Sequence, residues 1–489
     1  SGQVTLYHWK NSAWEALGSR INGISSTQTG YSIALSSDGT KLVVGSPYHN
    51  SQTGYVTVYE LADYQNDVPQ VQAIVSATEK NTSSNIFLVA TDAENDPITF
   101  AIASQPANGT VSLTGSYVVY TPTTDYVGTD SFTFTASDGS LTSSATTVSL
   151  TVFNSFLSTA TRIGQQLDGE STSDYFGQSV ATSQDGSRVV IGIYLDDGDG
   201  TYSDSGAVKV YEKTTTSTST TWVQLGVTIE GTANSQNLGR AVAMSPDGNT
   251  IFMRADGSNT HVYRWINSAW VQLGGAINHS ASQYNSLSSN FDGSNIAIAS
   301  DTQVEVYQYV NASWSIKGAT INQESSSDYS NAVALSADGN TLAIGAYQND
   351  GGGSDSGHVR IFGFENGAWI QLGTDIDGDG AGDHFGISVS LSADGSTLAV
   401  GARYYDTESD NNRGSVQIYS RSLTGTSTLW TQKGETLTGI ANSDFFGSDT
   451  TLSADGNILA VGAYNSNVNS SNSGQVTLYH WKNSAWEAL

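Results

Sequence analysis

Residues Phe385–Ala402 read F-G-I-S-V-S-L-S-A-D-G-S-T-L-A-V-G-A and contain the pattern that decides the fold. An apolar run interrupted by serines leads into an Asp-Gly pair, and a second apolar run follows it. Asp-Gly between two such runs is typical of a tight β-hairpin. The stretch therefore predicts two antiparallel strands joined by the turn Ser392–Gly395.

The turn motif S-x-D-G, or a close variant, recurs seven times along the chain. Its copies are Ser36–Gly39, Ser183–Gly186, Ser245–Gly248, Asn290–Gly293, Ser336–Gly339, Ser392–Gly395 and Ser453–Gly456. Successive motif glycines lie 45 to 62 residues apart, except for the 147 residues between Gly39 and Gly186. Each repeat continues with a third strand, such as Ser415–Tyr419, and a fourth strand, such as Trp369–Gly373. Four strands per repeat predict an all-β fold, a seven-bladed β-propeller of four-stranded blades.

A tryptophan opens the fourth strand of most repeats. These residues are Trp14, Trp222, Trp270, Trp314, Trp369 and Trp430. We interpret them as packing between neighbouring blades rather than as a platform for a ligand.

The chain of 489 residues has 46 acidic and 18 basic residues, a formal charge of −28, and no cysteine. Such a surface repels nucleic acid and anionic membranes and attracts divalent cations. The absence of cysteine excludes disulfides and Cys-based zinc sites. No apolar run approaches the roughly 20 residues that cross a bilayer, so we expect no membrane insertion. The sequence begins with Ser1 and shows no signal peptide, which suggests a segment of a longer precursor.

The two ends of the chain are identical. Residues 1–17 and 473–489 both read S-G-Q-V-T-L-Y-H-W-K-N-S-A-W-E-A-L. Each copy resembles the third and fourth strands of a blade, and either copy could complete the seventh blade. One explanation is a single domain with a duplicated closing segment, and the other, which we favour, is an array of near-identical units of 472 residues. The expected partners are therefore neighbouring copies of the same chain, in tandem or as a filament.

The repeats resemble the FG-GAP repeats of integrin α-chain propellers and their bacterial and algal relatives. The resemblance rests on the Phe-Gly steps at Phe176, Phe385 and Phe446 and on the L-A-V-G-A segments Leu398–Ala402 and Leu459–Ala463. It implies a propeller at the cell surface or outside the cell. In integrins a calcium loop joins the first two strands of a blade, whereas the short S-x-D-G turn stands at that place in this chain. The family's calcium sites therefore do not carry over to that loop.

Residues 66–157 interrupt the first blade and have a different texture. This segment holds four of the six prolines and ends in alternating T-V-S-L-T-V. It is similar to the cadherin-like, immunoglobulin-like domains of large bacterial adhesins, which implies a β-sandwich spacer with calcium at its edges. On that resemblance Asp92, Glu94 and Asp96 are candidate ligands, with Asp130 and Asp138 as weaker ones. The alternative is that these residues form turns on a solvated loop.

The resulting domain organisation has four parts. Residues 1–65 hold closing strands and the first blade, 66–157 the inserted sandwich, 158–472 the remaining blades, and 473–489 the repeated segment.

The loop Asp375–Asp383 is the best candidate for a metal site within the repeats. Asp375, Asp377, Asp379 and Asp383 follow a D-x-D-x-D-G-x-x-D spacing, in which alternate carboxylates converge on Ca²⁺ and glycine permits the tight turn. An acidic hairpin without metal is the alternative. A second acidic loop offers Asp197 and Asp199. Aspartates that precede the Phe-Gly position are expected to cap turns by accepting backbone amides; they are Asp174, Asp328, Asp383 and Asp444.

No catalytic residues are predicted, because the seven histidines are scattered and no nucleophile or P-loop motif occurs. The expectation is therefore that the chain is not an enzyme. The favoured function is a structural and adhesive repeat unit of an extracellular fibre or giant cell-surface protein, stabilised by calcium. The alternative is a propeller that binds surface glycans or proteins through loops and exposed aromatic residues.

Overall fold

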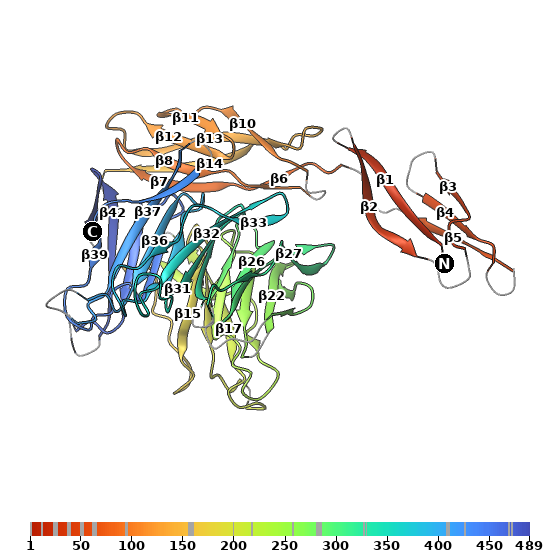
Figure 1. Ribbon diagram of the computed structural model, residues 1–489. Helices are drawn as coiled ribbons and strands as arrows, with labels where there is room; N and C mark the ends of the chain where they lie inside the picture. The colour runs from red at the N-terminus through yellow and green to blue at the C-terminus, as the bar shows by residue number, and fades with distance from the viewer. Residues whose placement is uncertain are drawn as a thin grey trace. The chain divides into compact units, whose positions relative to one another are not determined.

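The computed structural model of the protein contains strands and no helix in the part of the chain that it describes (Figure 1). That part comprises residues 2–10, 13–22, 28–36, 41–48, 53–60, 66–92, 96–154, 161–198, 200–216, 219–256, 259–279, 286–325, 328, 330–406, 411–424, 427–467, 470 and 473–489. Within these residues no helix has the length and hydropathy that a membrane crossing requires.

The chain divides into two compact units, and each is described by itself. Unit 1 comprises Ser1–Gln70, Thr91–Ile98 and Ser137–Ser143, and unit 2 comprises Val71–Ala90, Thr99–Ala136 and Ser144–Leu489.

Unit 1 contains a two-stranded hairpin and a three-stranded sheet. The hairpin joins β1 (Gln3–Lys10) to β2 (Ala13–Asn22), and the sheet has the order β3 (Ser32–Leu35), β4 (Lys41–Ser46), β5 (Tyr55–Glu60). Val4 of β1 is only 7% exposed and packs with Leu42 and Val44 of β4. The first copy of the duplicated segment therefore forms a hairpin that packs against this sheet.

Residues 74–153 form two sheets that share one core. One sheet has the order β10 (Thr99–Ser104), β13 (Gly128–Ser137), β14 (Thr146–Phe153), β7 (Ile74–Glu79), and the other β11 (Gly109–Thr114), β12 (Tyr117–Pro122), β8 (Ser84–Phe87). Two short strands, β6 (Gln70–Val71) and β9 (Ala90–Thr91), form a separate two-stranded sheet. Buried and exposed residues alternate along β13 and β14, as expected for strands with one face on a core. Phe132 and Phe134 fill that core.

Six four-stranded antiparallel meanders follow in unit 2, in chain order from yellow to blue (Figure 1). They are β15 (Phe176–Thr182), β16 (Arg188–Ile193), β17 (Ala207–Thr215), β18 (Thr220–Gln224); β20 (Ala241–Met244), β21 (Thr250–Arg254), β22 (Asn259–Ile266), β23 (Ala269–Gln272); β25 (Leu287–Ser289), β26 (Asn295–Ala299), β27 (Gln303–Val310), β28 (Ser313–Ile316); β30 (Ser330–Leu335), β31 (Thr341–Ala346), β32 (His358–Glu365), β33 (Ala368–Gln371); β35 (Phe385–Leu391), β36 (Thr397–Ala402), β37 (Ser415–Thr424), β38 (Ser427–Gln432); and β40 (Asp449–Leu452), β41 (Ile458–Ala463), β42 (Gln475–Lys482), β43 (Ala485–Ala488).

A two-residue strand after each of the first five meanders pairs with the third strand of its sheet. These strands are β19 (Ile229–Glu230), β24 (Ile277–Asn278), β29 (Ile321–Asn322), β34 (Ile376–Asp377) and β39 (Leu437–Thr438). The last meander is completed by the second copy of the duplicated segment, because β42 and β43 lie within residues 473–489.

Consecutive meanders bury aliphatic side chains against each other. Val208 and Val210 of β17, for example, share a core cluster with Val242 and Met244 of β20 in the next sheet. Burial of such side chains contributes about 1.5–3 kcal/mol each, so these contacts between sheets supply much of the stability.

The tryptophans that open the fourth strands link each sheet to the one before it. Each indole Nε1 donates to a backbone carbonyl of the preceding repeat at 2.8–3.1 Å. The pairs are Trp222–Ile163, Trp270–Leu225, Trp314–Leu273, Trp369–Lys317, Trp430–Leu372 and Trp486–Lys433. The prediction that the tryptophans pack between repeats is confirmed for the described ones.

Candidate functional site

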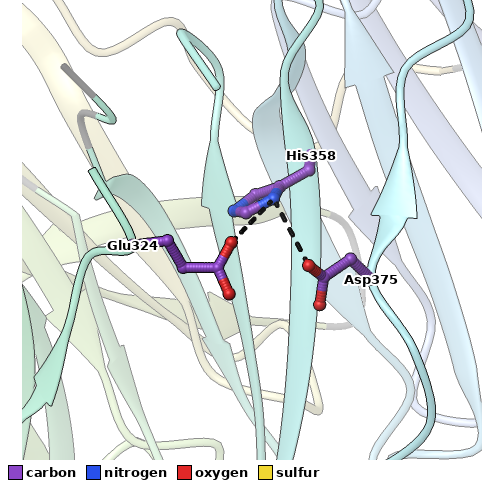
Figure 2. A group of neighbouring side chains, drawn as sticks. All are labelled: Glu324, His358 and Asp375. Atoms are coloured by element: carbon purple, nitrogen blue, oxygen red, sulfur yellow. Dashed lines mark ion pairs between the residues drawn. The ribbon is translucent and has the colours of Figure 1, made fainter. Parts of the chain in front are cut away.

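One histidine and two carboxylates from three segments meet in unit 2. Among the described residues, Glu324, His358 and Asp375 are the one group of three or more His, Asp or Glu whose ligand atoms lie within 4.8 Å of one another (Figure 2). His358 Nδ1 lies 4.0 Å from Glu324 Oε2 and 3.9 Å from Asp375 Oδ2. His358 begins β32, Glu324 follows β29 and Asp375 precedes β34. The pairing of β34 with β32 places Asp375 near His358.

The imidazole of His358 is held in its neutral form. The residue is 1% exposed, and burial lowers its pKa below the ordinary 6.5, with the charge of Arg360 acting in the same direction. Glu324 and Asp375 oppose this effect but do not outweigh it. A neutral imidazole keeps one nitrogen lone pair available for a metal or a hydrogen bond.

Arg360 occupies the place of a cation beside this group. Its Nη1 lies 3.5 Å from Glu324 Oε1, and its Nη2 donates to Asn322 O at 3.0 Å. The guanidinium thus already supplies positive charge to the carboxylate. One imidazole with two carboxylates is also a ligand set for Zn²⁺ rather than for Ca²⁺, which takes oxygen ligands. We therefore read the cluster as a polar contact that holds neighbouring segments together.

The predicted loop Asp375–Asp383 does not gather its four aspartates at one point. Asp375 joins the cluster above and accepts a hydrogen bond from Gln371 Nε2 at 2.5 Å. Asp377 lies in β34, opposite His358 in the strand register. Within the described residues, no three of the four aspartates have ligand atoms within 4.8 Å of one another.

Asp379 occupies a position that carries a polar contact in three repeats. In each repeat an acidic residue before the first strand faces the third residue of the third strand. The pairs are Glu170–Lys209 at 2.5 Å, Glu324–Arg360 at 3.5 Å and Asp379–Gln417 at 3.5 Å. In the third repeat the neutral Gln417 stands in place of the cation.

Asp383 is buried just before the Phe-Gly step. Its pKa is raised to about 6, first by burial and then by the nearby charges of Asp406 and Asp379, while backbone amides of Asp406 and Gly380 partly offset these effects. Asp328 and Asp444 at the same position accept the backbone amides of Ser325 and Ala441. For these three aspartates the expected turn-capping role is confirmed.

The second acidic loop is tied together by its own backbone. Asp197 Oδ1 accepts the amide of Asp204 at 2.7 Å, and Asp196 Oδ1 accepts the amide of Gly198. The other candidate ligand of this loop, Asp199, lies outside the described residues.

Among the candidate ligands near the inserted domain, some accept hydrogen bonds from the protein itself and one lies outside the described residues. Asp92 Oδ1 accepts the amide of Asp96 at 2.8 Å, and Glu94 lies outside the described residues. Asp130 is 8% exposed, and its two oxygens accept the amides of Ala107, Asn108 and Ser131 and the hydroxyl of Tyr120. Asp138 accepts the amides of Ser140 and Leu141 and the side chain of Asn66, which lower its pKa. Asp130 and Asp138 thus act as structural acceptors.

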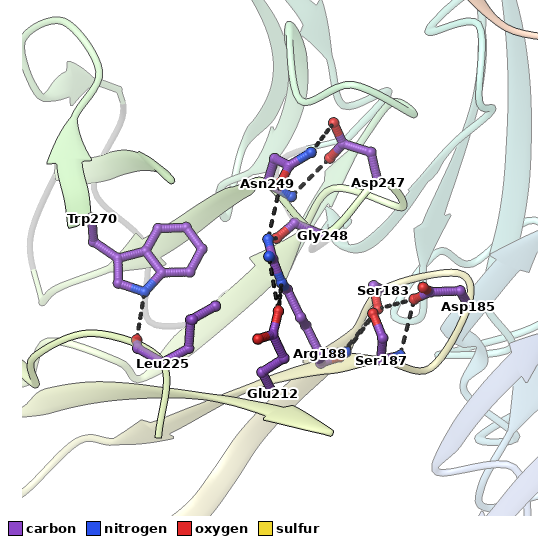
Figure 3. A network of polar contacts seen from close by, with 10 residues as sticks. All are labelled: Ser183, Asp185, Ser187, Arg188, Glu212, Leu225, Asp247, Gly248, Asn249 and Trp270. Atoms are coloured by element: carbon purple, nitrogen blue, oxygen red, sulfur yellow. Dashed lines mark hydrogen bonds and ion pairs between the residues drawn. The ribbon is translucent and has the colours of Figure 1, made fainter. Parts of the chain in front are cut away.

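The S-x-D-G turns satisfy their own polar groups (Figure 3). Ser183 Oγ donates to Asp185 Oδ1 at 2.6 Å, the same Oδ1 accepts the amide of Ser187, and Ser183 Oγ accepts the amide of Arg188. The same serine and aspartate contacts recur in the turns that begin at Ser245, Ser336, Ser392 and Ser453. The predicted hairpin turns are therefore confirmed at these five places, where the turn itself engages their oxygens. Residues 37–40 of the first predicted turn lie outside the described residues.

Arg188 connects one turn to the next sheet (Figure 3). Its guanidinium pairs with Glu212 at 2.9 Å and donates to Gly248 O and Asn249 Oδ1 in the following turn. The turns also bond backbone to backbone, as from Phe291 N to Ala337 O at 2.9 Å.

Sequence reasoning did not identify Glu324 and His358. They lie in separate segments without any local spacing motif, and the histidines are scattered along the chain. The available signal was the register of the repeats, which aligns Glu324 with Glu170 and Asp379.

Comparison with known families identifies two kinds of domain. Residues 66–151 match the bacterial Ig domain, and residues 168–211 and 374–419 match the FG-GAP repeat. None of the curated proteins matches the chain.

Solved structures similar to this one include three from different organisms. The periplasmic gluconolactonase PpgL of Pseudomonas aeruginosa is 17% identical, with 64% of this chain and 84% of that chain covered and a TM-score of 0.42. The Cps50 (Swd1) β-propeller domain of Myceliophteria thermophila is 12% identical, with 66% and 88% covered and a TM-score of 0.44. A functionally unknown protein from Desulfotomaculum acetoxidans is 13% identical, with 73% and 90% covered and a TM-score of 0.42.

The gluconolactonase corrects one expectation. The prediction that the chain is not an enzyme is contradicted by this similarity to an enzyme, although 17% identity assigns no activity to the present chain. The two matched families suggest an adhesion or extracellular repeat module and are typical of extracellular or cell-surface proteins. The chain thus contains one segment that matches the bacterial Ig domain and two segments that match the FG-GAP repeat.

Proposed function

We propose that this chain is a structural and adhesive repeat unit from which an extracellular fibre or giant cell-surface protein is built. In this proposal the repeats form a seven-bladed β-propeller, and the Ig domain is inserted in the first blade as a spacer. The partners of each unit are neighbouring copies of itself.

One observation carries the proposal. The same 17 residues occur at both ends of the sequence, and each copy folds as a hairpin next to repeat strands, one in unit 1 and one in unit 2. A chain that only closes on itself needs one such hairpin. Two identical hairpins suit a molecule in which each unit meets the next through the same contact.

The denatured mass of the native protein from its source tests the covalent form of this proposal. A mass of several times 51.4 kDa is expected if the units are joined in an array. A native protein of about 51.4 kDa that also stays monomeric at high concentration contradicts the proposal.

Calcium binding by the loop Asp375–Asp383 is part of the proposal. Supporting it are the formal charge of −28, the alternate aspartates, and the pKa of Asp383, which burial raises and to which repulsion by Asp406 and Asp379 adds. A cation bound there would relieve this repulsion and lower that pKa.

Removal of calcium is expected to lower Tm. A ligand at a hundred times its Kd adds about 2.7 kcal/mol of stability, which corresponds to several degrees in a domain of this size. Differential scanning fluorimetry with Ca²⁺, with Mg²⁺ and with EDTA measures the shift, and the double variant Asp379→Asn, Asp383→Asn should abolish it. A melt that EDTA leaves unchanged removes calcium from the account.

An aromatic ladder favours carbohydrate binding as a second candidate function. Five aromatic rings from the last three sheets form a row in which the centroids of successive rings lie 4.7–5.4 Å apart. Tyr464, the last ring of the row, is 56% exposed. They are Tyr347, His384, Tyr404, Phe445 and Tyr464. Aromatic faces offer sugar rings a large, rigid apolar surface. A glycan array without binding would count against this candidate and leave the first one unaffected.

A further inference from the structure

The S-x-D-G turns of the six meanders in unit 2 are bonded to one another through their backbones. In each case an amide of one turn donates to the carbonyl of the second residue of the next turn, at 2.8–3.2 Å. The bonds run from Gln184 N to Pro246 O, from Asp247 N to Phe291 O, from Phe291 N to Ala337 O, from Ala337 N to Ala393 O and from Ala393 N to Ala454 O. These six turns therefore form one continuous row, which we call the turn collar.

The turn collar and the Ig domain together line a cavity of about 250 Å³. Strands β7 and β8 of the Ig domain line one side of it, with Glu79 and Phe87 among their residues. The other side is lined by the second residues of five of the six turns, which are Gln184, Phe291, Ala337, Ala393 and Ala454. All of these residues belong to unit 2. Turns from five different sheets thus converge on one place, and the Ig domain covers it.

Tyr117 of β12 marks a second place where the Ig domain lies against the collar. Burial raises the pKa of its hydroxyl, and the charges of Asp394 and Asp338 raise it further. Asp338 and Asp394 stand in the turns of the fourth and fifth meanders. The ring of Phe87, which lines the cavity, lies 5.2 Å from that of Tyr117 between centroids. An aromatic pair of the Ig domain is therefore located beside the collar.

A buried carboxylate connects the Ig domain to the last sheet. Glu79, at the end of β7, is 5% exposed, and Lys482 Nζ donates to its two oxygens at 2.9 and 3.0 Å. His480 is also 5% exposed, and its Nδ1 lies 3.9 Å from Glu79 Oε2. A carboxylate removed from water depends on such partners, because the loss of one leaves an uncompensated buried charge. We call Glu79, His480 and Lys482 the latch.

Two of the three latch residues belong to the second copy of the duplicated segment. His480 and Lys482 lie in β42, and the first copy carries the same residue types as His8 and Lys10. Glu79 and Lys482 are 403 residues apart in the sequence. The latch therefore joins the first domain of unit 2 to its last sheet, across all the meanders between them.

The aromatic ladder lies at the opposite end of the sheets from the collar. In the fifth meander His384 precedes β35, the turn Ser392–Gly395 joins β35 to β36, and Tyr404 follows β36. The two strands are antiparallel, so the turn is at one end of them and His384 and Tyr404 are at the other. The Ig domain thus covers the end of the sheets that is remote from the ladder.

We propose that the Ig domain is a fixed cap on the turn collar and that the latch holds it there. This interaction lies within one chain, and it does not depend on the assembly of units. The Ig domain then moves with the repeats as one body instead of swinging on its two connections. Because the cap excludes ligands from the collar, the proposal also agrees with a ligand site at the ladder end.

Two spin labels measure whether the cap is fixed. The chain has no cysteine, so Thr129→Cys in the Ig domain and Leu429→Cys in the fifth meander supply the attachment sites. Both side chains are exposed in the structure. Double electron–electron resonance on this labelled chain should give one narrow distribution of distances. A broad distribution would mean that the Ig domain swings freely, and it would overturn the proposal.

The duplicated segment supplies a matched pair of variants for the latch. Lys482→Met leaves Glu79 buried without its cation, so docking of the cap should weaken roughly a hundredfold and the distances should broaden. Lys10→Met is the same substitution in the first copy and should keep the distribution narrow. Adding Glu79→Gln to Lys482→Met removes the buried charge and should restore most of the narrow population. Circular dichroism and tryptophan fluorescence on each variant check that the sheets remain folded.

Two results would contradict the assignment of the latch. If Lys482→Met keeps the narrow distribution of the parent chain, Glu79 and Lys482 do not hold the cap. If Lys10→Met broadens the distribution and Lys482→Met does not, the first copy of the segment holds the Ig domain in place of the second. Neither result bears on the assembly of units, so the proposed function is tested separately by the mass of the native protein.

Discussion

Alanine at Gly357 is expected to lower the free energy of unfolding of unit 2 by about 2–5 kcal/mol. Gly357 has a φ of +81°, and a methyl group there would lie 2.0 Å from Phe385 O and 2.7 Å from Phe385 N. Both atoms are backbone, and a bridge between Gly357 and Phe385 fixes their distance. The left-handed conformation costs a side chain about 1–2 kcal/mol, and overpacking adds about 1–3 kcal/mol.

Gly474 provides a matched control for this substitution. It holds the same place in the last meander, with a φ of +70°, but a methyl group there meets nothing closer than 3.3 Å. Gly474→Ala should therefore cost only the conformational part, about 1 kcal/mol in the isolated chain. Urea denaturation followed by tryptophan fluorescence compares the two variants. Equal losses would show that the sheets do not approach each other at Gly357 as described.

Alanine at Trp270 is expected to cost about 3–5 kcal/mol, the second large effect. The side chain is 9% exposed, its indole donates to Leu225 O at 2.9 Å, and its ring lies 5.2 Å from that of Trp265. Truncation leaves a cavity between two sheets and an unpaired carbonyl. The chain should show a lower urea midpoint and an earlier first unfolding transition.

Two further variants separate packing from hydrogen bonding at this position. Trp270→Phe keeps most of the ring and loses the donor, so it should cost less than alanine, about 1–3 kcal/mol beyond any change in packing. Val271→Ala, at a side chain that is 45% exposed, should change stability by less than about 0.5 kcal/mol. If Trp270→Ala behaves like Val271→Ala, the tryptophan does not join the sheets.

The strands were predictable because each repeat carries the sequence pattern of its strands and turns within a few neighbouring residues. Each Asp-Gly turn lies between two apolar runs, and this arrangement alone implies a hairpin, as Ser183–Arg188 shows. The tryptophans were predictable for the same reason, since a large apolar side chain at one fixed place in each repeat needs a neighbour that repeats as well.

The surroundings of the duplicated segment were not predictable. Residues 1–17 and 473–489 carry one pattern, and Val4 is buried whereas Val476 is exposed. What separates them is packing between sheets: Val4 shares a core cluster with Leu42 and Val44 of β4, whereas Val476 is 69% exposed. The sequence of a segment does not show which other segments pack against it.

The cluster Glu324, His358 and Asp375 escaped prediction for a related reason. The spacing Asp375–Asp383 suggested one convergent loop, but the pairing of β34 with β32 places Asp375 beside His358. The register of a two-residue strand therefore decided which side chains meet, and such a short strand has no distinct sequence signal.

The concentration dependence of the molar mass of the wild-type chain tests the central claim most directly, that this molecule is a unit that binds copies of itself. Multi-angle light scattering is expected to show a mass that rises above 51.4 kDa in steps of whole chains as the concentration increases. A mass that stays at 51.4 kDa at every accessible concentration, with and without calcium, would contradict the account.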